Sequence, residues 1–165
     1  MLLINQSVNS ISAYNPKKKN LPKRSEFHGV KAWLSAVQKE IGHNVIFALD
    51  EALMCQGNFL GRIDEYIIWV YTSEDMSEYN GIVVLGSNID DFYIDETDGL
   101  KYTNFNRTLE DALANENILD MQGITEALSN YYYSHNQSFD GIYVSPKYIS
   151  RFRDLANDAV NYYNT

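Results

Sequence analysis

Three side chains have the chemistry of a cysteine-dependent enzyme, and they follow one another as Cys55, His135 and Asp140. In such an enzyme the thiol attacks the substrate, an imidazole activates the thiol and a carboxylate orients the imidazole. The thiol must also have a lowered pKa, which a sequence does not reveal. Because Cys55 lies in an apolar run, a buried and inert thiol is the more ordinary interpretation. We therefore expect no catalytic residues and keep these three as the alternative set.

A run of carboxylates in the middle of the chain offers a second kind of chemistry. An EF-hand calcium loop needs carboxylates at positions 1, 3 and 5, a glycine at position 6 and a glutamate at position 12. If Gly99 is position 6, Ile94 falls at position 1, where a carboxylate is required, so the pattern fails. A looser calcium-binding loop, a solvated acidic loop and a surface for a basic partner remain, with tyrosines adding affinity to the last. We predict that the partner-binding residues are Asp90, Asp91, Tyr93, Asp95, Glu96, Asp98 and Tyr102.

Motifs for metals and nucleotides are missing from the sequence. The three histidines form no HxxxH pair, and one cysteine cannot make a CxxC motif. Neither a GxGxxG nor a GxxxxGK[ST] phosphate-binding motif occurs, and a GxSxG nucleophile motif does not occur either. We therefore expect no metal and no cofactor.

Charge is distributed unevenly along the chain, whose formal net charge is −9. Residues 63–140 hold sixteen acidic and two basic side chains, whereas residues 1–62 hold eight basic and four acidic ones. Such a surplus of carboxylates repels a phosphate backbone, so we expect no direct nucleic-acid binding. The same surplus favours association with a basic protein partner.

The chain has 165 residues, a normal length for one domain with its own core. Its single cysteine excludes an internal disulfide, which favours a reducing compartment. The N-terminus lacks the basic and apolar regions of a signal peptide, and no apolar run reaches the roughly 18 residues that span a membrane. We expect a cytoplasmic protein without membrane insertion, and the oligomeric state stays open.

The basic residues near the N-terminus predict a separate arm. Residues 1–24 contain two prolines and a cluster of lysines, which favours an extended, flexible segment over a helix. The arm either touches an acidic partner or is a poorly ordered terminus. Residues 25–165 are expected to form a single α+β domain, because the sequence has neither an internal repeat nor an interdomain linker.

A β-hairpin is expected at the centre of that domain. Residues 65–72 are β-branched and aromatic with two apolar faces, as in a central strand that is covered on both sides. Residues 81–86 have the same character. The connection between them is short for a parallel crossover and ends in Asn80-Gly81, so we predict antiparallel pairing. The predicted fold is α+β, with a small, mostly antiparallel sheet covered by an N-terminal and a C-terminal helix.

Apolar spacing and capping residues predict the other elements. The clearest helix has an apolar stripe over residues 26–41, and Pro146 is suited to open the last helix. Thr108 and Asp120 are candidate N-caps of two further helices. The remaining predictions are strands at 44–47, 92–94, 102–105 and 141–144 and a short helix at 49–55.

Three hypotheses of function follow from these patterns. The first is a small, acidic, non-catalytic binding or inhibitor protein, of the microbial immunity or phage or plasmid anti-defence type, that docks on a basic protein. The second is a secretion-type chaperone or adaptor, which an exposed apolar groove and a stable dimer would indicate. The third is an effector enzyme that uses Cys55, which a pocket joining Cys55 to His135 would indicate.

Overall fold

The computed structural model of the chain describes residues 14–58 and 67–164. These residues form five α-helices and a five-stranded sheet, which confirms the α+β class. The helices are α2 (Val30–Ile41), α3 (Leu49–Cys55), α4 (Phe105–Ala114), α5 (Met121–Ser134) and α6 (Ile149–Asn161). The strands are β1 (Ile46–Phe47), β2 (Ile68–Tyr71), β3 (Ile82–Gly86), β4 (Ile94–Thr97) and β5 (Leu100–Thr103).

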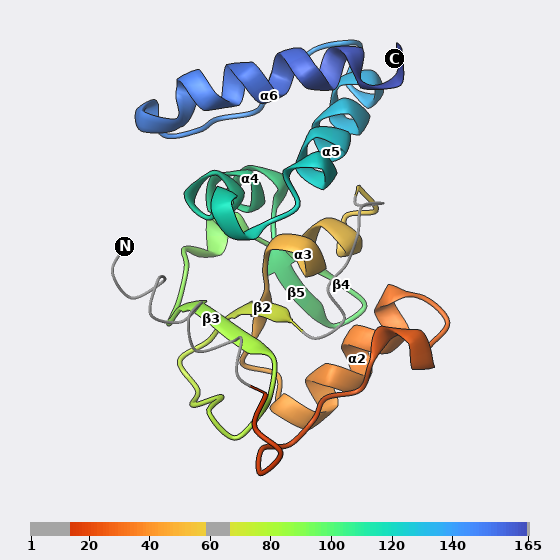
Figure 1. The fold of residues 1–165 in the computed structure, drawn as a ribbon, viewed down its shortest axis with the longest axis vertical. Coiled ribbons are helices and arrows are strands. Elements are labelled where there is room, and N and C mark those ends of the chain that lie inside the picture. Colours follow the sequence, from red (N-terminus) through yellow and green to blue (C-terminus); the bar gives the residue numbers. More distant parts are fainter. Residues whose placement is uncertain (1–13, 59–66, 165) are drawn as a thin grey trace.

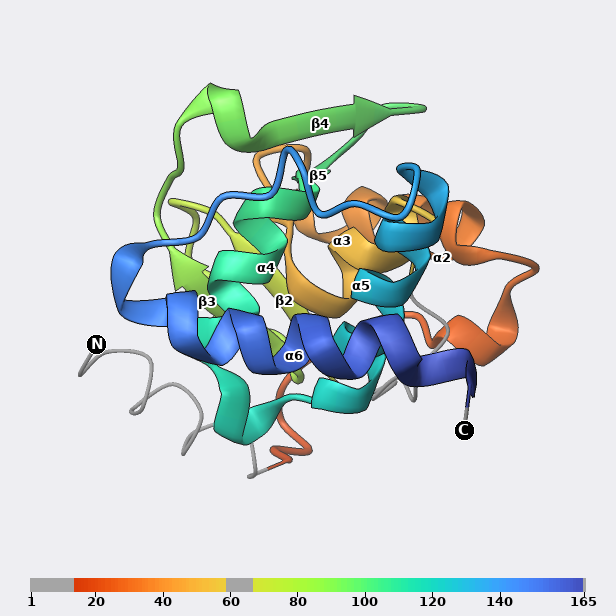
Figure 2. The same ribbon diagram turned by 90° about the horizontal axis from the view of Figure 1, so that it is seen from above.

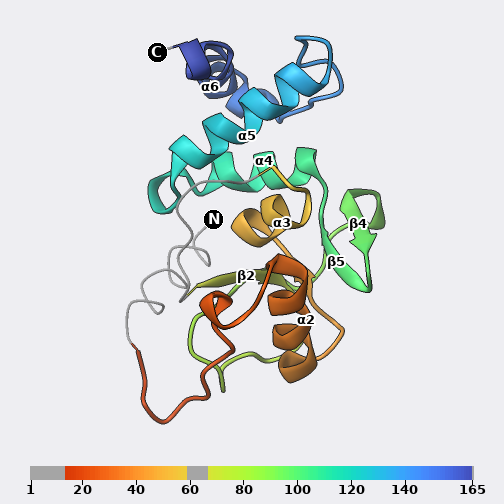
Figure 3. The same cartoon turned by 90° about the vertical axis from the view of Figure 1, so that its right-hand side faces the viewer.

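The helices and the sheet form one stack, in which α3 contacts β2 and β5 and α2 contacts β5. Figures 1 and 3 show α2 at one end of the molecule, then the sheet with α3, then α4, α5 and finally α6. Viewed from above, α6 lies across α4 and α5 (Figure 2). The C-terminal helix therefore lies on the far side of α4 and α5 from the sheet. No helix within the described ranges is both long enough and apolar enough to cross a membrane.

The sheet is mixed, so the prediction of a mostly antiparallel sheet is wrong. Its strand order is β3-β2-β1-β5-β4. The β1–β2 and β4–β5 pairs are antiparallel, whereas the β1–β5 and β2–β3 pairs are parallel. All four residues of β2 are buried, as expected of an inner strand with two apolar faces.

The two strands of the predicted hairpin are parallel, with Ile68 opposite Ile82 and Val70 opposite Val84. Ten residues of extended chain reach about 33 Å, whereas a four-residue strand is only about 13 Å long. The ten residues 72–81 therefore return to the start of the next strand without a crossover helix. Residues 65 and 66 of the predicted strand lie outside the described residues.

The N-terminal basic segment contacts this crossover. The Lys19 N–H donates to the Glu78 carbonyl at 2.8 Å, and the Asn80 N–H donates to the Lys19 carbonyl at 2.8 Å. The Asn80 side chain donates to the Asn15 carbonyl at 2.9 Å and accepts from the Asn15 N–H at 3.0 Å. These bonds connect residues 15–19 to the domain, while residues 1–13 of the predicted arm lie outside the described residues.

The predicted strand at 141–144 is wrong, because these residues form no strand. Their backbone groups bond to a side chain of α4 instead of to a neighbouring strand. The Asn106 amide donates to the Gly141 carbonyl at 2.9 Å, and its oxygen accepts from the Tyr143 N–H at 2.9 Å. This segment leads into η4, the short 3₁₀ helix Pro146–Tyr148 that precedes α6.

Local capping sets the ends of the two middle helices. The Asp120 side chain accepts from the Gln122 N–H, so α5 begins where the sequence predicted. The α4 helix begins earlier than predicted, because Asn104 rather than Thr108 caps it by accepting from the Arg107 N–H. Thr108 is buried inside the helix, and its hydroxyl lies 2.6 Å from that of Thr103. The N-terminal helix α2 begins after Gly29, whose φ of 92° suits glycine.

Candidate functional site

An open cleft of about 500 Å³ lies beyond the C-terminal ends of β2 and β3. These ends meet at the same edge of the sheet because the two strands are parallel, and crevices at such edges commonly bind ligands. The β2 strand ends in Tyr71, and β3 ends in Gly86. One face of α4 and the η4 segment form the other walls. The lining residues include Tyr71, Gly86, Ser87, Asn88, Arg107, Glu110, Asp111, Lys147 and Tyr148.

Three of the lining residues form a hydrogen-bonded group that we call the Tyr71 triad: Tyr71, Arg107 and Asp111. The Tyr71 hydroxyl donates to Asp111 Oδ1 at 2.7 Å and accepts from Arg107 Nη2 at 2.9 Å. Arg107 Nε lies 3.2 Å from the same Asp111 oxygen, one helical turn away. The arrangement fixes the direction in which the guanidinium points, because the ion pair through Nε and the hydrogen bond from Nη2 lie on one side of it.

The carboxylate of the triad is almost completely shielded from water. Asp111 is 6% exposed, and its Oδ2 atom is buried without a hydrogen-bond partner among the described residues. Burial raises the pKa of Asp111 to about 6, although Arg107 and the Tyr71 hydroxyl favour the charged form. Burial, together with the charge of Asp111, also raises the pKa of Tyr71, so this hydroxyl remains protonated.

A glycine permits the close contact between the two parallel strands at the cleft. A Cβ atom added to Gly86 would lie 3.2 Å from Cε1 of the Tyr71 ring. That separation is tighter than an ordinary van der Waals contact, so a side chain here would displace the ring. The small residue therefore helps to keep the Tyr71 hydroxyl between Arg107 and Asp111.

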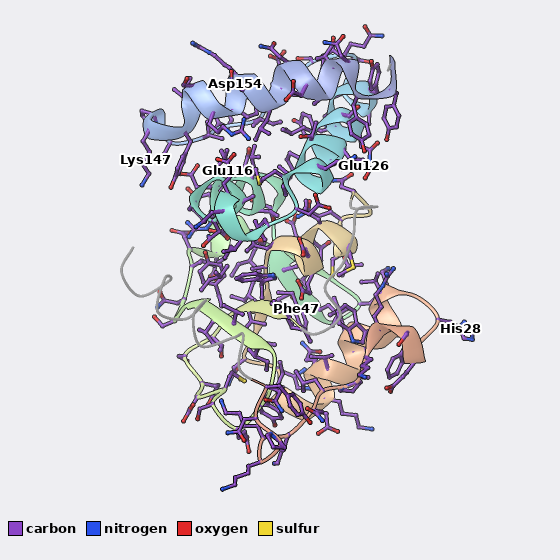
Figure 4. All side chains as sticks on the ribbon, in the orientation of Figure 1. His28, Phe47, Glu116, Glu126, Lys147 and Asp154 are labelled. Carbon is purple, nitrogen blue, oxygen red and sulfur yellow. The ribbon has the colours of Figure 1, made fainter. Side chains whose placement is uncertain are left out.

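Glu110 and Lys147 are the other charged side chains of the cleft, and they differ in their polar partners. Glu110 accepts two hydrogen bonds from Ser145, one from the backbone N–H at 3.0 Å and one from the hydroxyl. Lys147 is exposed, and its ammonium lies 5.0 Å from the centre of the Tyr148 ring. Among the described residues, no carboxylate lies within ion-pair distance of Lys147. Figure 4 shows Lys147 at the end of α6 opposite the C-terminus of the chain.

The carboxylates predicted from the sequence gather on β4 and on the short 3₁₀ helix η2 (Asp91–Tyr93) ahead of it. The β4 strand is at the end of the described strand order, so this surface lies along a sheet edge. Asp91, Asp95 and Glu96 are exposed, and Glu96 is opposite Lys101 on β5. We call Asp90, Asp91, Phe92, Asp95 and Glu96 the acidic edge.

Two further predicted carboxylates have defined local partners. Asp98 forms an ion pair of 2.7 Å with Lys31, and both side chains are exposed. Asp90 caps η2 by accepting from the Phe92 N–H at 2.9 Å. An exposed ion pair such as that between Asp98 and Lys31 contributes little to stability, so its main effect is on the surface charge.

The predicted aromatic residues are less accessible than the carboxylates. Tyr102 is 7% exposed, and its hydroxyl lies 2.7 Å from that of Thr97, so it is not part of the exposed surface. Tyr93 is half-buried, with its ring 5.7 Å from the Arg107 guanidinium. The exposed aromatic residue of the acidic edge is Phe92, at 79%, which the sequence analysis did not select. Tyr93 also makes the acidic edge a neighbour of the Tyr71 triad.

The alternative catalytic set is not assembled in the structure. Cys55 lies in the last turn of α3, and burial raises the pKa of its thiol to about 12, opposite to what a nucleophile needs. His135 is exposed at the end of α5 and stacks on Tyr131, with ring centres 3.8 Å apart. Figures 1 and 3 show that end of α5 directed away from α3. Asp140 is exposed, and its carbonyl accepts from the Tyr131 hydroxyl.

The described part of the chain contains no group of three or more His, Cys, Asp or Glu side chains that could hold a metal ion. Comparison of the chain with protein-family models, curated proteins and solved structures found no match. The arguments for function therefore rest on the acidic edge and on the cleft.

Proposed function

We propose that the protein is a small, non-catalytic binding or inhibitor protein that docks its acidic edge on a basic protein partner. We place this activity in the cytoplasm and in the immunity or anti-defence class, where small acidic proteins neutralise a basic target. The partner is a protein, and no direct contact with nucleic acid is part of the proposal.

The observation that carries the proposal is the composition of one sheet edge. Phe92 is 79% exposed and lies between exposed carboxylates, Asp91 before it and Asp95 after it. An exposed aromatic ring within a charged rim has the anatomy of a protein interface. The backbone of an end strand also offers hydrogen-bonding groups to an added strand.

The distribution of ion pairs supports a residual negative field at this edge. Asp91 and Asp95 have no ion-pair partner among the described residues, whereas Glu78, Asp111 and Glu116 each have one elsewhere. Unpaired carboxylates on an exposed edge attract a basic protein at long range and raise its association rate by roughly 10- to 1,000-fold. Aromatic contact with Phe92 then supplies affinity after the encounter.

The proposal is tested by removing the charge and the ring together. The tagged chain is used to isolate a partner from its host, and the partner is purified for binding kinetics. The test variant combines Asp91→Asn, Phe92→Ala and Asp95→Asn. We expect its association rate to fall about tenfold or more and its salt dependence to flatten, because both depend on the field.

A matched variant controls for the loss of charge as such. It combines Asp154→Asn and Asp158→Asn with Tyr143→Ala, all at exposed positions outside the acidic edge. Circular dichroism and unfolding midpoints confirm that both variants fold. The proposal is wrong if the two variants bind the partner equally well, or if the test variant keeps the association rate and salt slope of the parent.

A further inference from the structure

In the cleft beyond β2 and β3, the carboxylate acceptors are already in use, whereas several donors are not. Its two carboxylates already accept bonds from the protein: Glu110 from Ser145, and Asp111 from Tyr71. The Asp111 Oδ2 atom has no partner but is buried, so nothing in the cleft can contact it directly. The carboxylate acceptors of the cleft are therefore either occupied or inaccessible.

Several donors of the cleft, by contrast, have no partner among the described residues. Arg107 Nη2 donates to Tyr71 and Nε faces Asp111 within the Tyr71 triad, which leaves Nη1 on the other side without a hydrogen-bond partner among the described residues. The Arg107 side chain is 30% exposed and lines the cleft. Lys147 has no carboxylate partner, and the exposed side chains of Ser87 and Asn88 make no hydrogen bond to other described residues.

Size and lining bear on the kind of molecule that these donors would bind. A volume of about 500 Å³ is in the usual range for small organic ligands and is much larger than a single oxyanion needs. Leu85, Ala114 and Tyr148 supply apolar surface next to the donors. Arginine and lysine together are suited to carboxylate and phosphate groups, and a guanidinium held in place by its neighbours loses less freedom on binding.

We propose that this cleft binds a small organic oxyanion, a molecule with a carboxylate or phosphate group held by Arg107 and Lys147 and an organic part held against Tyr148. The Tyr71 triad positions the guanidinium. Ser87 and Asn88, which follow β3, complete the polar wall. No residue of the acidic edge lines the cleft, so a partner protein and a small anion can each be tested without the other.

The test is an NMR titration of the full-length, ¹⁵N-labelled protein with four probes: phenyl phosphate, phenylacetate, the uncharged phenylacetamide and inorganic phosphate. We expect saturable shifts of the Ser87, Asn88 and Lys147 amides with at least one organic anion and weaker binding of phenylacetamide and inorganic phosphate. Saturation by phenyl phosphate alone assigns a phosphate monoester, and saturation by phenylacetate alone assigns a carboxylate.

Two lysine variants make the test specific. Lys147→Gln removes a cation of the cleft and should raise the dissociation constant about tenfold, the effect of losing one charge-assisted hydrogen bond. Lys39→Gln removes an exposed cation of α2 outside the cleft and should leave the constant unchanged. Both are surface substitutions that leave the Tyr71 triad intact.

Several outcomes overturn the assignment. The proposal is overturned if neither organic anion gives saturable shifts, if phenylacetamide binds as tightly as the anions, or if the two lysine variants weaken binding equally. If inorganic phosphate binds as tightly as phenyl phosphate, the organic part of the ligand is not recognised.

Discussion

The acidic edge and the Tyr71 triad both contain carboxylates from the acidic middle of the chain, yet the two regions treat charge differently. At the edge, Asp91 and Asp95 are exposed and have no ion-pair partner among the described residues. In the triad, Asp111 is 6% exposed and bonded to two neighbours. Water screens the charges of Asp91 and Asp95, whereas the charge of Asp111 must be compensated by groups within the protein.

The difference shows that the number of charges in a segment says little about their effect. An exposed carboxylate changes the long-range field and the association rate but contributes little to the free energy of unfolding. A buried carboxylate contributes little to the long-range field but strongly affects the free energy of unfolding, because removing its partners leaves an uncompensated charge. Substitutions at the two regions should therefore separate stability from association.

The largest expected effect is at the triad. Asp111→Ala leaves the Arg107 guanidinium and the Tyr71 hydroxyl without their acceptor and should lower the free energy of unfolding by about 3–4 kcal/mol. We expect the lower part of the range for broken buried pairs, because the Arg107 side chain is 30% exposed and water can reach part of it. Urea unfolding followed by circular dichroism measures the change.

Asp154→Ala is the matched substitution for that experiment. Asp154 is exposed on α6, where Figure 4 labels it. Its replacement should change stability by no more than about 0.5 kcal/mol, as is usual for surface positions. Equal losses in the two variants would mean that the triad is not compensated in the way that its geometry indicates.

The sequence predicted the parts of this molecule that depend on local signals. Asp120 marks the start of α5 because a capping side chain acts within one turn of its own helix. The predicted direction of β3 was wrong because a ten-residue connection can return to either end of the next strand, and in the structure it also contacts Lys19, which is distant in the chain. Chain length between two strands does not reveal such contacts.

The same limit applies to the candidate sites. The carboxylates of the acidic edge were found from composition, but the burial of Tyr102 depends on packing that composition does not describe. The triad was missed because Tyr71 is 40 residues from Asp111. The one local signal was Arg107, which is four residues before Asp111 and so lies on the same face of a helix.

A pH series gives the next largest effect and tests the burial of Asp111 directly. Its pKa is raised from 3.8 to about 6, so the folded state holds this proton more tightly than the unfolded chain does. Between about pH 4 and pH 6 the native state therefore binds more protons, and stability from this group falls as pH rises. The free energy of unfolding should fall by about 2–3 kcal/mol in total across this window. Above pH 6 the contribution of Asp111 should stay constant.

The comparison is with Asp111→Asn, which keeps an acceptor for the Tyr71 hydroxyl but cannot ionise. Unfolding free energies of the parent and this variant are measured in parallel across the window. We expect the parent to lose stability relative to the variant as pH rises to about 6. A relative gain would instead mean that Arg107 and Tyr71 outweigh burial and lower the pKa of the carboxyl.

The smallest expected effect is at the acidic edge. Combining Asp91→Asn with Asp95→Asn removes two exposed charges that make no ion pair with the described residues, so the free energy of unfolding should stay within about 0.5 kcal/mol of the parent. Urea unfolding at low and high salt measures it, and the difference between the two salt conditions should also be small. A clear loss of stability would show that these carboxylates hold the edge strand in place, which would leave them less free to steer a partner. An unchanged stability together with a slower association would instead assign these carboxylates to binding alone.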